Sequence, residues 1–214
     1  MKFTALLTAL FLTASFAEDK TPPLDYTPLF DGKTLDGWKS NDEDKDKTIF
    51  SVKDGELVVK GGRAHLFYVG KDGKATWNNF IFKAKVLTKA NANSGLYIQT
   101  EYQKDGWPSK GYECQVNNSF DKDPRRTGSL YAVKDFGDVI VKDDVWFDYE
   151  IKVEAKHITI SINGKVTADY LEKEGDARQP GMEGRWLKGG TFAIQAHDPG
   201  CEVHYKDIMV KALP

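Results

Sequence analysis

The chain of 214 residues is poor in cysteine and histidine, with two and four respectively, and it has no excess of charge of either sign. Its 30 basic and 32 acidic side chains give a formal net charge of −2, which is unlike the basic surface that nucleic-acid binding requires. It also lacks H-E-x-x-H, Cys-x-x-Cys, phosphate-loop and nucleophile-elbow motifs. These absences argue against a nucleic-acid partner and against the common motif-based classes of enzyme.

Long hydrophobic runs are missing except at the N-terminus. Residues 1–17 have one basic residue, Lys2, then an apolar core and a small-x-small ending at Ser15 and Ala17. This pattern predicts a secretory signal peptide that is cleaved after Ala17. The run is short for a bilayer span, so no membrane anchor is expected. We therefore expect a secreted or periplasmic protein, with an exposed, proline-rich lead-in at 18–28 and a single domain at 29–214.

The two cysteines leave two alternatives open. Export would permit a disulfide between Cys114 and Cys201. Cys114, however, lies on the apolar row of its expected strand, which is equally typical of a buried thiol. The spacing alone does not choose between these alternatives.

Helical periodicity is also absent, and short alternating runs separated by turn signals take its place. Asp54-Gly55 and Asn163-Gly164 are typical hairpin turns. The runs that we expect to be strands cover residues 50–53, 56–60, 63–69, 80–86, 94–101, 111–117, 129–133, 146–154, 157–162, 165–170, 191–198 and 201–210. The pattern predicts an all-β fold, an antiparallel sandwich or barrel, with a long loop at 173–190.

The stretch from 93 to 117 has unusual polar residues on one side of each strand. Leu96 and Ile98 share the apolar face of the first strand, and Cys114 and Val116 share that of the second. The opposite faces carry Tyr97, Gln99 and Glu101, and Glu113, Gln115 and Asn117. Side chains of these types suit hydrogen bonding and stacking against a sugar, so we expect a carbohydrate substrate.

Glu113 and His197 are the predicted catalytic residues, because burial and neighbouring charges can adjust their pKa values for acid–base work. The alternative is that Glu113 is a satisfied structural residue of its strand. The predicted substrate-binding residues are Tyr97, Gln99, Glu101, Gln115, Asn117, Arg126, Tyr131, Gln195 and Trp107. Trp107 is the predicted sugar-stacking residue, because it lies in the turn-rich insert between the two central strands.

Two further patterns of acidic residues are typical of other chemistries. Glu101 and Glu113 could form the carboxylate pair of a conventional glucanase, although the Glu-x-Asp-x-x-Glu motif of such enzymes is missing. Asp42, Asp44 and Asp46 resemble the start of a calcium loop, but Lys47 and Lys53 replace the required Gly and Glu. The three remaining histidines, His65, His157 and His204, stand alone and are expected to be structural. No metal-ligand set is therefore predicted.

Several motifs in order resemble the 3-keto-disaccharide hydrolase domain family. They are L-F-D-G-K-T-L-D-G-W, N-S-G-L-Y-I-Q, G-Y-E-C-Q-V, R-T-G-S-L-Y and A-I-Q-A-H-D, followed by V-H-Y-K-D-I, and the resemblance covers roughly Tyr26 to Leu213. It implies a concanavalin A-like jelly-roll sandwich of two antiparallel sheets, with substrate on the concave sheet. Members often have an arginine near the end of the N-S-G strand, where this chain continues Q-T-E-Y.

The resemblance also implies a reaction. A ketone at C3 of a glycoside acidifies the C2 hydrogen, so a base can remove it and expel the C1 substituent before water adds back. Glu113 and His197 match the polar signature positions, Gln99, Gln115 and Gln195 would orient substrate, and Tyr131 would donate to it. A divalent metal is a possible cofactor of such sites. A carbohydrate-binding module without catalysis remains an alternative, because fold does not fix function, and the sequence does not give the oligomeric state.

Overall fold

The computed structural model describes residues 25–41 and 49–214. The predicted signal peptide, most of the lead-in and the Asp42–Asp46 segment lie outside these residues. Within them no helix is present, so no helix is long and apolar enough to cross a membrane.

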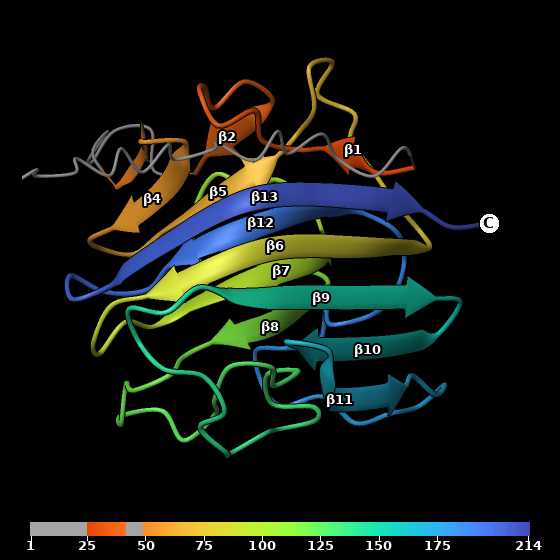
Figure 1. The fold of residues 1–214 in the computed structure, drawn as a ribbon. Helices are drawn as coiled ribbons and strands as arrows, with labels where there is room; N and C mark the ends of the chain where they lie inside the picture. The colour runs from red at the N-terminus through yellow and green to blue at the C-terminus, as the bar shows by residue number, and fades with distance from the viewer. Residues whose placement is uncertain (1–24, 42–48) are drawn as a thin grey trace, which may run out of the picture.

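The described strands form two antiparallel sheets that pack face to face, as predicted (Figure 1). The large sheet has the order β11-β10-β9-β6-β13-β4-β3, with β1 paired to β13. Its strands are β1 (Thr27–Pro28), β3 (Phe50–Lys53), β4 (Glu56–Lys60), β6 (Phe80–Thr88), β9 (Phe147–Glu154), β10 (His157–Ile162), β11 (Lys165–Leu171) and β13 (Glu202–Ala212). The small sheet has the order β2-β5-β12-β7-β8. Its strands are β2 (Trp38–Ser40), β5 (Ala64–Tyr68), β7 (Ser94–Thr100), β8 (Tyr112–Val116) and β12 (Thr191–Ala196).

The core lies between the two sheets and follows the period-2 pattern of the sequence. In β6 every second residue is buried, beginning with Phe80 and Phe82. Phe192 of the small sheet packs against both rings, with centroids 4.9 Å apart in each case. Burying one such side chain contributes about 1.5–3 kcal/mol, so this aromatic cluster is a large part of what holds the sheets together.

Two expectations about strands are corrected. Residues 129–133 do not form a strand. Leu130 makes isolated bridges to Cys114 and Lys134, and Ala132 has a φ of 60° in the turn between Leu130 and Lys134. Thr27 and Pro28, expected to precede any element, pair with β13 although both are exposed. The two cysteines are free and buried, which is the second of the two alternatives.

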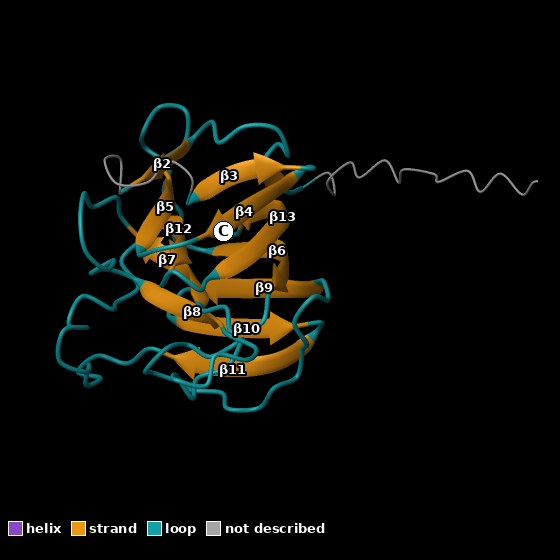
Figure 2. Ribbon diagram, turned by 90° about the vertical axis from the view of Figure 1, so that its left-hand side faces the viewer, coloured by secondary structure: helices purple, strands orange, loops and turns teal. Residues whose placement is uncertain are grey.

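Loops cover the outer face of the small sheet. If that face were open to solvent, buried and exposed residues would alternate along its strands. Every residue of β7, β8 and β12 is buried. Figure 2 shows loops running beyond β5, β7 and β8 on the side away from the large sheet. The polar rows of these strands therefore face a partly enclosed space between sheet and loops.

Candidate functional site

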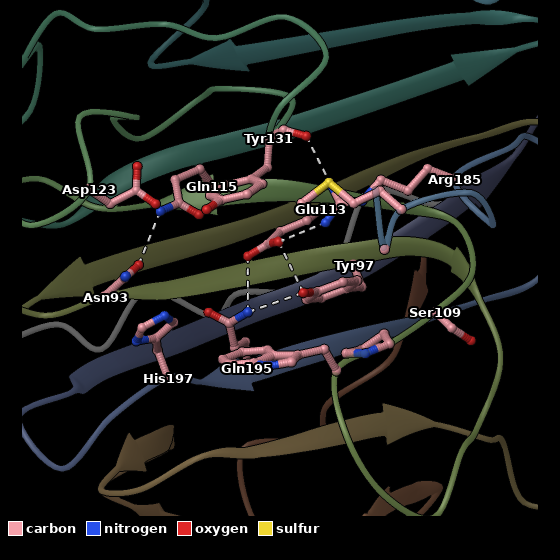
Figure 3. Close-up of a pocket in the computed structure, with 14 residues that line it drawn as sticks. Asn93, Tyr97, Ser109, Glu113, Gln115, Asp123, Tyr131, Arg185, Gln195 and His197 are labelled. Atoms are coloured by element: carbon pink, nitrogen blue, oxygen red, sulfur yellow. Dashed lines mark hydrogen bonds and ion pairs between the residues drawn. The ribbon is translucent and has the colours of Figure 1, made fainter. Parts of the chain in front are cut away.

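A pocket opens on the outer face of the small sheet (Figure 3). We call it the Glu113 pocket. Its lining consists of Asn93, Tyr97, Trp107, Pro108, Ser109, Glu113, Gln115, Asp123, Tyr131, Gly181, Met182, Arg185, Gln195 and His197. Its volume of about 290 Å³ lies near the lower end of the range for small-molecule sites, roughly 300 Å³.

Three neighbouring strands bring together a hydrogen-bonded trio at the base of the pocket. Tyr97 of β7 lies directly opposite Glu113 of β8, and Gln195 comes from β12. The Tyr97 hydroxyl donates to Glu113 Oε2 at 3.0 Å, and Gln195 Nε2 donates to Glu113 Oε1 at 2.9 Å. Burial and the charge of Glu113 raise the pKa of Tyr97 well above 10, so its hydroxyl stays a donor.

Arg185 completes this arrangement from the loop before β12. Its guanidinium donates to Glu113 Oε2 at 3.2 Å and to the Tyr131 carbonyl oxygen at 2.9 Å. Both charged side chains are buried, with 8% and 7% of their surface exposed. Glu113 thus accepts from three side chains at once, and the guanidinium places a positive charge at the pocket wall.

A second buried carboxylate fixes the loop that carries Arg185. Glu172 Oε2 accepts from the Leu187 amide at 2.8 Å and from the Tyr112 hydroxyl at 2.6 Å. Arg178 Nε donates to the Arg185 carbonyl oxygen at 2.6 Å. The backbone is therefore held at the Arg185 carbonyl and at the Leu187 amide, which restricts where the guanidinium can lie.

His197 forms a pair with the next residue. Its Nδ1 lies 2.9 Å from Asp198 Oδ2, so the proton of the neutral ring belongs on Nδ1 and Nε2 is left as an acceptor. The ring packs against Trp107 and Phe120, with centroids 5.2 Å and 6.0 Å away. A histidine that is held by a carboxylate and lines a pocket can serve as a general base.

The other predicted residues that line the pocket are Gln115, Tyr131 and Trp107. Gln115 Nε2 donates to Asn93 Oδ1 at 3.0 Å, while its Oε1 is buried without a partner in the described structure. Burial and Asp123 raise the pKa of Tyr131 to about 12, so the phenol stays protonated. Trp107 is 41% exposed at the rim.

Four predicted binding residues do not line the pocket. Gln99 and Glu101 lie at a second hollow beside Trp186, where Glu101 pairs with Lys110. Asn117 is buried and donates to three carbonyl oxygens of the following loop, and Arg126 donates to Asn117 Oδ1 at 3.2 Å. The structure therefore separates Glu101 from Glu113 and makes Asn117 and Arg126 supports of a loop.

Sequence reasoning missed Arg185, Asn93 and Asp123. Arg185 and Asp123 come from loops, where no periodicity assigns a face, and Asn93 lies just before the first residue of β7. The N-S-G strand lacks the arginine often seen in the resembled family, and here an arginine reaches the site from a loop.

A divalent metal does not fit this donor set. No group of three His, Cys, Asp or Glu side chains suited to a metal occurs in residues 25–41 and 49–214. Both Glu113 oxygens already accept hydrogen bonds, and the Arg185 cation beside them opposes a second cation.

Comparisons with known proteins agree with this architecture. No curated protein sequence matches the chain significantly. A candidate glycosyl hydrolase from Parabacteroides distasonis has a TM-score of 0.72 at 22% identity, over 89% of this chain and 94% of that one. The carbohydrate-binding module CBM66 from Bacillus subtilis has a TM-score of 0.58 at 10% identity, over 82% of this chain and 96% of that one.

SCLam, a non-specific endo-β-1,3(4)-glucanase of family GH16, has a TM-score of 0.54 at 13% identity, over 89% of this chain and 93% of that one. At these identities the likeness concerns the fold, a jelly-roll sandwich. The model of the 3-keto-α-glucoside-1,2-lyase-like domain matches residues 25–211, nearly all of the described chain. The chain belongs to the 3-keto-α-glucoside-1,2-lyase-like domain family.

Proposed function

We propose that the protein is an exported enzyme that cleaves glycosides oxidised at C3, by elimination across C1 and C2 followed by hydration. The observation that carries the proposal is one pocket that joins a carboxylate-held base, His197, to a buried cation, Arg185. Export is proposed from the signal-peptide pattern of residues 1–17.

In the first step His197 Nε2 removes the hydrogen from C2. The electron pair of the C2–H bond becomes an enolate that is conjugated with the C3 ketone. Among the described residues, Glu113 and the Tyr131 carbonyl oxygen each accept from one of the five guanidinium N–H donors of Arg185. The other donors can bind the developing enolate oxygen. A positive charge in a buried pocket stabilises this oxyanion more than it would in water.

In the second step the enolate expels the C1 substituent. The C1–O bond breaks, a C1–C2 double bond forms, and the departing oxygen takes the proton that His197 acquired. Tyr131 lines the same pocket, and its phenol stays protonated because burial and the hydrogen bond with Asp123 raise its pKa to about 12. Water then adds its hydroxyl to C1 and a hydrogen to C2, so that elimination and hydration together amount to hydrolysis.

A carbohydrate-binding module is the second candidate, and Trp107 is the feature that favours it. An exposed tryptophan at a pocket rim is a platform for a sugar ring. The structural likeness to CBM66 is consistent with such a role. A binding module needs this platform and hydrogen-bonding groups but no base.

The test compares a 3-keto-glucoside with its unoxidised parent, with and without EDTA. We expect cleavage of the keto substrate alone and a rate that EDTA leaves unchanged. His197→Ala should lower kcat roughly 10²- to 10⁴-fold, the usual contribution of a general base. His157→Ala, at an exposed histidine outside the pocket, is the matched control. Cleavage of the parent would contradict the mechanism, and binding without cleavage would favour the module.

A further inference from the structure

His65 is a buried histidine that the proposed reaction does not use. Its residue exposure is 0%, and neither ring nitrogen has a hydrogen-bond partner in the described structure. A buried polar group without a partner costs about 1–3 kcal/mol, so native structures rarely keep one without a reason.

The ring lies next to the Glu113 pocket. His65 of β5 is directly opposite Gln195 of β12, and side chains of such a pair share one face of the sheet. The imidazole meets Tyr97 edge-on with centroids 5.5 Å apart and Trp107 edge-on at 5.4 Å. Trp107, Tyr97 and Gln195 line the Glu113 pocket and His65 does not, so the imidazole lies directly behind these residues.

Trp107 lies in a loop, residues 101–111, whose backbone is held mainly by hydrogen bonds from the loop's own side chains. Gln103 donates to the carbonyl oxygens of Asp105 and Trp107 and accepts from the amide and the hydroxyl of Ser109. Beyond the loop, Asn41 Nδ2 reaches the Gly106 carbonyl oxygen at 3.3 Å. The rings of Tyr102 and Trp107 also pack on Phe67 and His197, so lifting the loop gives up these contacts while its internal hydrogen bonds stay formed.

We propose that His65 and the inner face of Trp107 form a second sugar subsite, which opens when the 101–111 loop lifts and which receives the ring attached to C1. The inference rests on the carbohydrate substrate proposed above. It assigns to His65 a substrate contact that the closed loop conceals.

The chemistry of this position suits a neutral polyhydroxylated ring. Neutral imidazole has one donor and one acceptor, which matches a hydroxyl that also donates and accepts. Burial, Arg63 and His197 lower the pKa of His65 to about 3, so the ring stays neutral at ordinary pH and does not select for charge. Tyr97 and Trp107 supply aromatic faces for the apolar side of a sugar.

Labelling of histidines with diethyl pyrocarbonate, mapped by mass spectrometry, tests the subsite without any need for turnover. We expect His65 to be labelled roughly tenfold faster in Trp107→Ala than in wild type, and the unoxidised parent disaccharide to slow the labelling of wild type, which keeps both walls of the subsite. Trp186→Ala, at the second hollow, is the matched control and should leave His65 protected. The exposed His157 serves as an internal reference for reagent and folding.

Unchanged labelling of His65 in Trp107→Ala would overturn the proposal, and so would labelling of wild-type His65 that the disaccharide does not slow. His65→Phe gives a second measurement, because it keeps a ring but removes both nitrogens. Its KM for a 3-keto disaccharide should rise roughly tenfold with kcat unchanged, the equivalent of one lost hydrogen bond, while a methyl 3-keto-glucoside is unaffected. Protection of His65 without turnover would refute the proposed reaction and retain the subsite; equal effects on both substrates would refute the subsite.

Discussion

The Arg185 guanidinium lies 3.2 Å from Glu113 Oε2, although 72 positions separate the two residues in sequence. The pair joins a strand of the small sheet to the loop before β12. Both side chains are almost fully buried, so each charge depends on the other for compensation.

The first prediction concerns this pair. Arg185→Met would leave Glu113 buried without its cation and should lower the free energy of unfolding by about 3–5 kcal/mol. Adding Glu113→Gln should recover part of that loss, because it removes the uncompensated charge. Urea unfolding of the wild type, both single variants and the double variant measures this coupling. Strictly additive effects would show that the two charges do not depend on each other.

Gly95 supports the carboxylate from the neighbouring strand. A Cβ at this position would lie 2.8 Å from Glu113 Oε1 and 3.0 Å from its Cγ. Gly95→Ala should displace Glu113, reduce activity and lower stability by about 1–3 kcal/mol through overpacking. Gly62→Ala is the matched control, since a Cβ there meets nothing within 4 Å. Kinetics and thermal unfolding measure both variants, and equal behaviour would argue against this steric role.

The sequence predicts the residues on the strands better than those on the loops. Period-2 alternation placed Tyr97, Glu113 and Gln195 on polar faces, and the strand pairing then brings them within hydrogen-bond distance. Alternation contains no information on strand order. The contact of Gln195 with Glu113 could therefore be expected only if their strands lay in the same sheet. It also misled at Gln99, whose side chain binds the Asn78 carbonyl oxygen and the Gly189 amide away from the pocket.

The loop residues of the site show no alternation of polar and apolar residues that would predict their position. Arg185 follows no periodic pattern, and its position depends on Glu172 and Arg178, which lie far from Glu113 in sequence. Ser129–Val133 reads as a strand because its residues are of strand-forming types, but the two bridges of Leu130 close a tight turn instead. Tertiary contacts decide such segments, and local propensity is too weak to compete with them.

Asp198 should matter to catalysis through the tautomer of His197. Asp198→Asn replaces the acceptor at Nδ1 with an amide that can equally well donate, so Nε2 is no longer reserved as the base. We expect kcat on the keto substrate to fall roughly 10²-fold with KM little changed. Asp169→Asn is the control, because Asp169 forms a similar contact with exposed His157 and neither residue lines the Glu113 pocket. A normal kcat in Asp198→Asn would argue against His197 as the base.

Glu172 should make the fold sensitive to acid. Burial opposes ionisation of its carboxyl, but hydrogen bonds from Lys156, Tyr112 and the Leu187 amide outweigh burial and leave its pKa below the ordinary 4.5. A depressed pKa stabilises the fold above pH 4.5, and this contribution is lost as pH falls through the folded-state value. Glu172→Gln should therefore be less stable than wild type at pH 7, with the difference shrinking toward pH 3. Urea unfolding at several pH values measures it, and a constant difference would contradict the assignment.

His65 should also make the fold sensitive to acid, but at higher pH than Glu172 and as a base that is kept neutral by burial. The folded-state pKa is about 3, whereas an unfolded chain takes up the proton near 6.5, so between these values the unfolded state binds more protons. Stability should therefore fall as pH drops below 6.5, by about 2–3 kcal/mol at pH 4.5.

His65→Phe removes this titration and should be less sensitive to pH between 6.5 and 4.5 than wild type. At pH 7 it should be at least as stable, because two unpartnered buried nitrogens are gone. His157→Phe, at an exposed site, is the matched control for the substitution itself. Urea unfolding across the range compares the three proteins. A parallel slope in wild type and His65→Phe would mean that the folded state lets His65 take up a proton, which the closed packing of Trp107 and Tyr97 around it opposes.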